Sequence, residues 1–126
     1  MQFGFNGDPE ITRVWIGAAG RIPDDPWGVQ PNTKGRVAFS DAGLNRRSTE
    51  VLIHLGDNSE AYADTHAPFG QVVSGMNVVE KLYSGYGDYP PSGKGPDRIR
   101  LLMEGNAYLS KELPRLDYIK TATLAQ

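Results

Sequence analysis

Glycine and proline recur so closely along this chain that they leave little room for long helices or strands. The 126 residues include 15 glycines and 9 prolines, and both residue types favour turns over the interior of regular elements. A chain of this length fits one domain and can bury a hydrophobic core. The sequence therefore predicts a single domain, residues 1–126, built from short strands and short helices.

Short apolar runs between the turns alternate with the two-residue period of half-buried strands. The candidate strands are residues 35–43, 50–55, 67–73 and 97–105. In the last of these, Ile99 and Leu101 would lie on one face. Several short strands separated by turn residues are typical of an antiparallel barrel or sandwich, with helices as caps.

Two short helices are expected, at residues 75–83 and 106–113. Ser74 and Asn106 are the candidate N-caps, because short polar side chains accept hydrogen bonds from the free amides of a first helical turn. Pro114 ends the second helix, since proline cannot continue the hydrogen-bond ladder.

Residues 6–34 are rich in Gly, Pro, Asp and Asn, which predicts successive turns in place of helix or strand. A segment this long without regular structure is uncommon inside a compact domain. We expect it to be ordered, because Trp15 and Trp27 can pack their large rings against the rest of the domain.

Composition argues against several classes of partner. The net charge is -2, from 13 basic and 15 acidic residues, so no nucleic-acid partner is expected. No apolar run approaches the roughly 20 residues that span a bilayer, so no membrane partner is expected either. The absence of cysteine excludes disulfides and thiolate ligands. It slightly favours the cytoplasm, but the compartment stays open.

Residue patterns alone predict no reaction. The two histidines, His54 and His66, lack the spacing of a metal motif, so no metal site is assigned. Asp41, Glu50 and Glu60 are more simply explained as solvated carboxylates than as acid–base catalysts. For His66, a packed polar residue and a ligand contact remain equal alternatives.

Four blocks of the chain resemble the cyclophilin-type peptidyl-prolyl cis-trans isomerases. They are GRVAFSDAGLNRRSTEVLIHLGDN, HAPFGQVVSGMNVVEKLYSGYG, GPDRIRLLMEGNAYL and PRLDYI. With MQFGFNGDPEI and IPDDP, the resemblance covers nearly the whole chain. It implies a mainly β fold, a cyclophilin-like antiparallel β-barrel with short capping helices. It also implies binding of proline-containing peptide or protein segments, and isomerisation of Xaa-Pro bonds without a cofactor or a covalent intermediate.

The resemblance implies a peptide-binding groove formed by eight residues. They are Gln2, Ser40, Asp41, Ala42, Glu50, Leu52, Ala61 and His66. Glu50 stands in place of a glutamine of the family, and Leu52 in place of the phenylalanine of the pocket floor. Glu60 and Ala61 fall where the family often has an aromatic residue and a leucine. We therefore expect a groove that is more acidic and less aromatic than is usual in the family.

The resemblance places the catalytic arginine of the family before Met1, so no catalytic residue is assigned and the barrel is expected to be incomplete at its N terminus. Arg46 or Arg47 could stand in for that arginine from a nearby loop, although a solvated loop charge is the simpler alternative. An open barrel exposes strand edges, so self-association is one expected outcome. The alternative functions are a non-catalytic proline-peptide-binding module and an inactive fragment.

Overall fold

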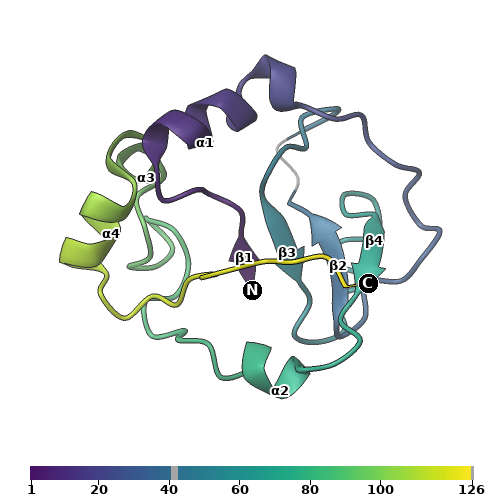
Figure 1. The fold of residues 1–126 in the computed structure, drawn as a ribbon. Coiled ribbons are helices and arrows are strands. Elements are labelled where there is room, and N and C mark those ends of the chain that lie inside the picture. The colour runs from purple at the N-terminus through teal and green to yellow at the C-terminus, as the bar shows by residue number, and fades with distance from the viewer. Residues whose placement is uncertain (41–42, 126) are drawn as a thin grey trace.

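The centre of the molecule is an antiparallel sheet of four strands in the order β1-β3-β2-β4. The computed structural model describes residues 1–40 and 43–125. The strands are β1 (Gln2–Phe3), β2 (Arg36–Phe39), β3 (Val51–Ile53) and β4 (Pro68–Gln71). Figure 1 shows them side by side, with β1 and β4 at the two edges. The strands predicted at 35–43, 50–55 and 67–73 are confirmed, except that residues 41 and 42 lie outside the described part of the chain.

The sheet is open. Within the described residues, no pairing joins β1 to β4, so the predicted closure into a barrel is not confirmed. The coarser prediction of antiparallel strands with short helices is confirmed. Strand β1 was not predicted, because two residues are too few to show an alternating pattern.

Pairing with β3 places side chains from three strands on one face of the sheet. Gln2 of β1 and Ala38 of β2 both lie directly opposite Leu52, and directly opposed residues share a face. Glu50 and Ser40 lie two positions from Leu52 and Ala38, so the strand period carries them to the same side. We call the surface formed by these five residues the Leu52 face.

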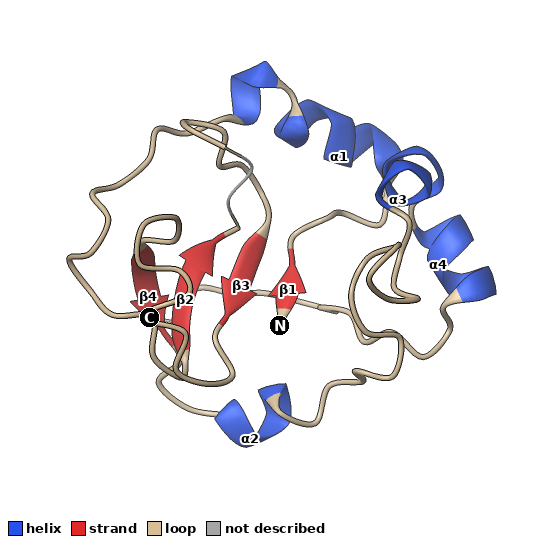
Figure 2. Ribbon diagram, turned by 180° about the vertical axis from the view of Figure 1, so that it is seen from behind, coloured by secondary structure: helices blue, strands red, loops and turns tan. Residues whose placement is uncertain are grey.

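The helices lie around the sheet. They are α1 (Pro9–Ile16), α2 (Met76–Val79), α3 (Arg98–Glu104) and α4 (Asn106–Glu112), with a 3-10 turn, η1, at Ala18–Gly20. Figure 2 shows α1, α3 and α4 grouped on the β1 side of the sheet, with α2 apart from them. Helix α3 contacts both α1 and α4.

Helix α1 overturns the prediction that residues 6–34 lack regular structure. Asp8 is its N-cap and accepts a 2.9 Å hydrogen bond from the amide two residues further on, while Pro9 occupies the first helical position. Both are signals for the start of a helix, and the surrounding turn residues obscured them. Trp15 and Trp27, which were expected to pack against the rest of the domain, are 58% and 44% exposed.

The strand predicted at residues 97–105 is wrong, because this segment forms α3. Asp97 is the N-cap, and its carboxylate accepts a 2.9 Å hydrogen bond from the amide of Arg100. Arg100 also forms an ion pair with a glutamate one turn further on, a spacing that stabilises helices. Ile99 is 74% exposed and Leu101 5% exposed, so the two side chains do not share a face.

Both predicted helices exist, but neither uses the predicted N-cap. Helix α2 is shorter than residues 75–83, and Gly75 caps it in place of Ser74. Gly105 caps α4 in place of Asn106. The two glycines have φ values of 84° and 54°, a region that side-chain-bearing residues rarely adopt. Backbone geometry, and not a side-chain hydrogen bond, therefore sets these two helix starts.

Few apolar side chains are fully buried. Ala38 and Ile53 lie in the sheet, and Leu101, Tyr108 and Leu113 lie in or next to the helices. The buried polar residues are Thr12, Asn32, Arg47, Glu50, His54 and His66. A buried polar group is costly unless it is hydrogen-bonded. The stability of this fold therefore depends on the hydrogen bonds and ion pairs of these residues.

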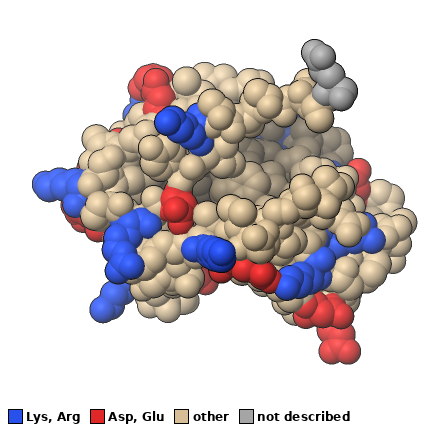
Figure 3. Space-filling view, turned by 60° about the horizontal axis from the view of Figure 1, so that its bottom comes forward, with Lys and Arg blue, Asp and Glu red and all other residues tan. Residues whose placement is uncertain are grey.

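A hollow of about 1330 Å³ lies between the β1 edge and the helices. Its lining includes Phe3, Phe5, Trp15, Leu101 and Leu109. Figure 3 shows one face of the molecule hollowed, with mostly uncharged walls and charged side chains around the opening. The apolar residues of the sheet and of the helices therefore border an open space and do not form one continuous core.

Candidate functional site

Gln2, Ser40 and Glu50 are joined by hydrogen bonds on the Leu52 face. The amide nitrogen Nε2 of Gln2 donates to Oγ of Ser40 at 3.2 Å and also to Oε2 of Glu50. Gln2 comes from β1, while Ser40 follows β2 and Glu50 precedes β3. The antiparallel register therefore assembles three of the predicted site residues into one polar cluster.

Arg98, the first residue of α3, completes this cluster from the side of the helices. Its guanidinium donates to both carboxylate oxygens of Glu50, with 2.9 Å between Nη1 and Oε2. The rings of Phe5 and Tyr89 lie 5.5 and 5.2 Å from its Cζ atom, which orients the planar guanidinium. Sequence analysis missed Arg98, because nothing in a single sequence signals a pair 48 positions apart.

Burial and charge shift two pKa values in this cluster. Burial disfavours the charged form of Arg98, but the hydrogen bonds and charge of Glu50 outweigh it and raise the pKa of the guanidinium. Burial, followed by the charge of Glu50, raises the pKa of the Tyr89 phenol. Arg98 is therefore charged and Tyr89 neutral at ordinary pH.

A cavity of about 340 Å³ opens beside Leu52. Its lining includes Gln2, Leu52, His54, Asn58 and Tyr62. The Leu52 face thus provides a pocket next to the polar cluster.

His54 is a neutral histidine in the wall of this cavity. Burial lowers its pKa, and the charges of His66 and of the N-terminal ammonium group lower it further. The side-chain nitrogen of Asn58 lies 3.0 Å from Nδ1. Because that nitrogen can only donate, Nδ1 accepts and Nε2 carries the proton. Nε2 is buried, and no described residue accepts a hydrogen bond from it, so this N–H is an unpaired donor behind the cavity wall.

His66 is buried behind Tyr62. The two rings lie 4.5 Å apart in an edge-to-face arrangement, and the Tyr62 ring lies 5.8 Å from His54. The side-chain amide of Asn32 donates to the backbone carbonyls of Tyr62 and His66 at 3.1 and 3.0 Å. Tyr62 is the second residue that sequence analysis missed, although an aromatic residue directly after Ala61 was a usable signal.

The structure brings five of the eight predicted site residues to this region. Gln2, Ser40, Glu50 and Leu52 share one face, and His66 lies in the layer behind Tyr62. Ala61 is exposed and does not line the cavity, and Glu60 is exposed as well. The predicted residues Asp41 and Ala42 lie outside the described residues.

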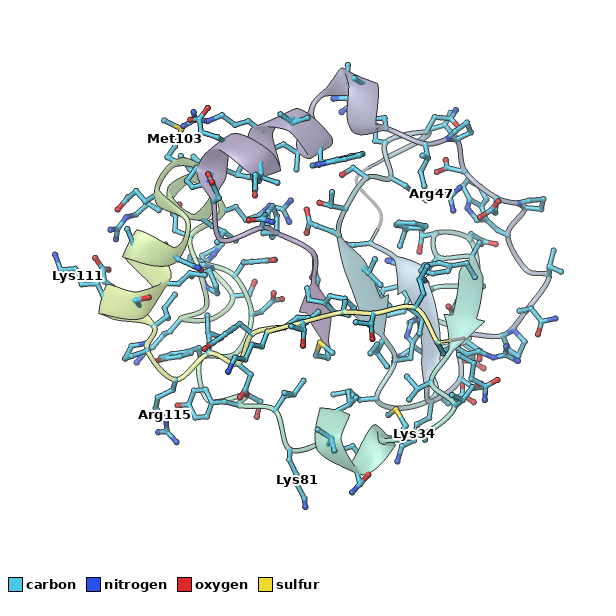
Figure 4. The ribbon with its side chains drawn as sticks, in the orientation of Figure 1. Lys34, Arg47, Lys81, Met103, Lys111 and Arg115 are labelled. Atoms are coloured by element: carbon cyan, nitrogen blue, oxygen red, sulfur yellow. The ribbon has the colours of Figure 1, made fainter. Side chains whose placement is uncertain are left out.

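Neither of the two loop arginines is placed as a free cation in this site. Arg47, labelled in Figure 4, is buried, forms ion pairs with Asp24 at 3.3 Å and Asp25 at 2.8 Å, and also donates to the carbonyl of Pro23. Its Cζ lies 5.4 Å from the centre of the Phe39 ring. Arg47 therefore anchors the segment that follows η1. Arg46 is exposed. The arginine that reaches the polar cluster is Arg98.

Residues 1–40 and 43–125 contain no group of three or more His, Asp or Glu side chains that could hold a metal ion. In the same ranges, no helix has the length and apolar character needed to cross a bilayer.

Comparisons with known proteins point to one family. A family model described as cyclophilin type peptidyl-prolyl cis-trans isomerase/CLD matches residues 5–101. Peptidyl-prolyl cis-trans isomerase sig-7 of Caenorhabditis elegans is 40% identical over 48 residues, which are 38% of this chain and 11% of that protein. Peptidyl-prolyl cis-trans isomerase-like 4 of Mus musculus is 30% identical over 54 residues, 43% of this chain and 11% of that protein. The matched parts therefore make up a small fraction of both relatives.

Proposed function

Because the chain belongs to the cyclophilin-type peptidyl-prolyl cis-trans isomerase family, we propose that its Leu52 face binds Xaa-Pro segments of peptides or proteins and assists their cis–trans interconversion. The residues proposed for peptide binding are Gln2, Ser40, Asp41, Ala42, Glu50, Leu52, Ala61 and His66. His54 and Tyr62 join them as walls of the pocket.

The chemistry requires positioning and not covalent catalysis. Rotation about an Xaa-Pro bond has a barrier of about 18–20 kcal/mol, because the amide is conjugated. A pocket that holds the proline ring while polar groups hold the flanking carbonyls can favour the twisted, less conjugated amide. Leu52 offers apolar contact for the ring, and the polar side chains of Gln2 and Asn58 line the same cavity.

The observation that carries the proposal is the register of three strands. It places the polar side chains of Gln2, Ser40 and Glu50 next to a cavity with Leu52 in its wall. Apolar and hydrogen-bonding surface are thus adjacent on one face, as an extended peptide containing a proline requires.

A non-catalytic proline-peptide-binding module is the second candidate. Arg98 is the arginine that contacts the polar cluster, and the carboxylate of Glu50 already binds it through two donors. A guanidinium that is already paired with a carboxylate stabilises a twisted amide less than an unpaired guanidinium does. This pairing favours binding without strong catalysis.

We further propose that residues 1–126 form one domain whose open sheet is a wall of a cyclophilin-like barrel. The exposed edge of β1 and the apolar hollow beside it support this proposal, because added strands would pair with the edge and cover the hollow. A second copy of the chain can supply such strands. Light scattering at several concentrations tests self-association, and a constant monomer mass would argue against it.

Proton NMR exchange spectroscopy, which detects interconversion of the cis and trans forms of an Ala-Pro peptide, tests the function. We expect Leu52→Ala to weaken peptide binding by about tenfold, because it removes apolar contact area from the pocket. Val51→Ala is the matched control, since Val51 is the neighbour on the opposite face of β3, and it should change the affinity by less than about twofold.

The same spectra separate the two candidates. Cross-peaks between cis and trans peptide signals that grow with protein concentration support catalysis. Binding without such cross-peaks supports the non-catalytic module. If no peptide signal shifts or broadens, the groove assignment is wrong.

A further inference from the structure

The side-chain amide of Gln2 has both of its N–H groups committed inside the protein. Nε2 donates one hydrogen to Ser40 Oγ and the other to Glu50 Oε2. A primary amide has two donors on nitrogen and an acceptor with two lone pairs on oxygen. No described residue donates to Oε1 of Gln2, and Gln2 is an exposed residue in the lining of the cavity. The Gln2 side chain can therefore offer a ligand only a hydrogen-bond acceptor, its carbonyl oxygen.

Glu50 fixes this orientation. An ionised carboxylate can only accept hydrogen bonds, so the Gln2 atom that faces it must be the nitrogen and not the oxygen. Arg98 holds the Glu50 carboxylate in place by donating to both of its oxygens, and the rings of Phe5 and Tyr89 orient Arg98 in turn. A glutamine at position 50 would both donate and accept, so it would allow either orientation of the Gln2 amide.

We propose that Gln2, held by Glu50 and Arg98, recognises a backbone N–H of the bound peptide through its carbonyl oxygen. The inference rests on the proposed peptide-binding function and adds a specificity rule to it. Gln2 contacts the peptide, while Glu50 and Arg98 are positioning residues that act through it.

The rule follows from the chemistry of proline. Proline has no backbone N–H, so the donor must belong to a residue that flanks it. The ligand is accordingly an extended peptide with a proline in the cavity and an ordinary, N–H-bearing residue next to it. Peptides that carry a second proline or an N-methyl group at that flanking position lack the donor and bind less tightly.

Titration calorimetry with three peptides tests the rule. The parent is acetyl-Ala-Ala-Pro-Ala-Ala-amide, and two analogues carry an N-methyl group on the alanine before or after the proline. One analogue should bind the wild-type protein about fivefold less tightly, the effect of one hydrogen bond. The other should bind with less than about twofold change.

Variants separate the hydrogen bond from steric effects of the methyl group. Gln2→Met has a similar length but no acceptor oxygen of this kind, and Glu50→Gln releases the amide orientation. In both variants, the affinity ratio between parent and sensitive analogue should fall to less than about twofold. Arg13→Ala, in an exposed pair on α1, is the control and should keep the wild-type ratio. If Glu50→Gln does not fold, Gln2→Met still decides the matter.

The possible results separate the role of Gln2 from the peptide-binding function. Parent and analogues binding wild type equally, or a ratio that persists in Gln2→Met, overturns the role of Gln2 and leaves the peptide-binding function intact. Absence of any binding by the parent peptide overturns both. A ratio present in wild type and lost in both variants supports the proposal.

Discussion

Arg98 and Glu50 lie 48 positions apart in the sequence, and the guanidinium of one donates to both carboxylate oxygens of the other. The pair connects the first turn of α3 with the residue before β3. Glu50 is buried, with 12% of its side chain exposed, whereas 46% of the Arg98 side chain is exposed. One ion pair thus links the helical group to the sheet at the proposed binding site.

Arg98→Ala should lower the free energy of unfolding by about 1–2 kcal/mol, because it removes the cation from a buried carboxylate. The partial exposure of Arg98 keeps the figure below that of a fully buried pair. Arg13→Ala removes one partner of an exposed pair on α1 and should cost less than about 0.5 kcal/mol. Urea unfolding measures both, and equal losses would contradict the importance of Glu50.

Arg47→Ala should cost about 3 kcal/mol, because it leaves the carboxylate of Asp24 poorly solvated and unpaired. Its exposed neighbour is the control, and Arg46→Ala should stay within about 0.5 kcal/mol of wild type. Limited trypsin digestion should also cut the Arg47 variant faster after Arg21, in the segment that Arg47 anchors. Unchanged cutting would show that other contacts hold this segment.

Acid should weaken the fold through His54. Its pKa in the folded protein is lowered from the usual 6.5, chiefly by burial, so the unfolded chain binds more protons at mildly acidic pH. The stabilisation is therefore fully present above pH 6.5 and is lost as the pH falls from there through the lower pKa of the folded state. Urea unfolding at pH 7.5 and 5.5 should show a smaller pH effect in His54→Leu than in wild type.

The comparison of wild type with His54→Leu separates the contribution of His54 to the pH effect from that of other groups. The N-terminal ammonium group of Met1 also has a pKa lowered by burial, and its contribution is common to both proteins. An equal pH effect in wild type and His54→Leu would assign the acid sensitivity to other groups.

Asp97→Ala should cost about 1 kcal/mol, because Asp97 caps the helix that carries Arg98. Asp97→Asn is the matched variant, since asparagine is an equally good N-cap, and it should be close to wild type in stability. Helical circular dichroism and urea unfolding measure the effect. If both variants lose the same stability, the charge of Asp97 matters and the cap does not.

The sequence predicts the sheet better than the helices, for a physical reason. Strands 35–43 and 50–55 are recognisable because one buried face imposes a two-residue period. Residues 97–105 show two apolar residues two apart, but Asp97 and the Arg100–Glu104 pair start and support a helix there. A short segment contains too few repeats of either period to distinguish a helix from a strand. N-cap residues should therefore count for more than alternation in such segments.

The candidate site is predictable only where it is local in sequence. The resemblance supplied Gln2, Glu50 and Leu52, and the two-residue period of the strand at 50–55 places Glu50 and Leu52 on one face. Arg98 could not be found, because its role depends on the start of α3 reaching Glu50, the residue before β3, a tertiary relationship with no local pattern. Arg47 was misjudged for the same reason, since its partner Asp24 comes from the distant loop that it anchors.

A backbone amide spectrum of this chain, recorded with an excess of an Ala-Pro peptide and then of an Ala-Ala peptide, tests whether the Leu52 face selects proline. We expect the Ala-Pro peptide to shift the amide signals of Gln2, Leu52 and Tyr62, which line one cavity. The Ala-Ala peptide should leave them in place, and signals of α4 should not respond to either peptide. Identical shifts with both peptides, or none near Leu52, would contradict a proline-binding site on this face.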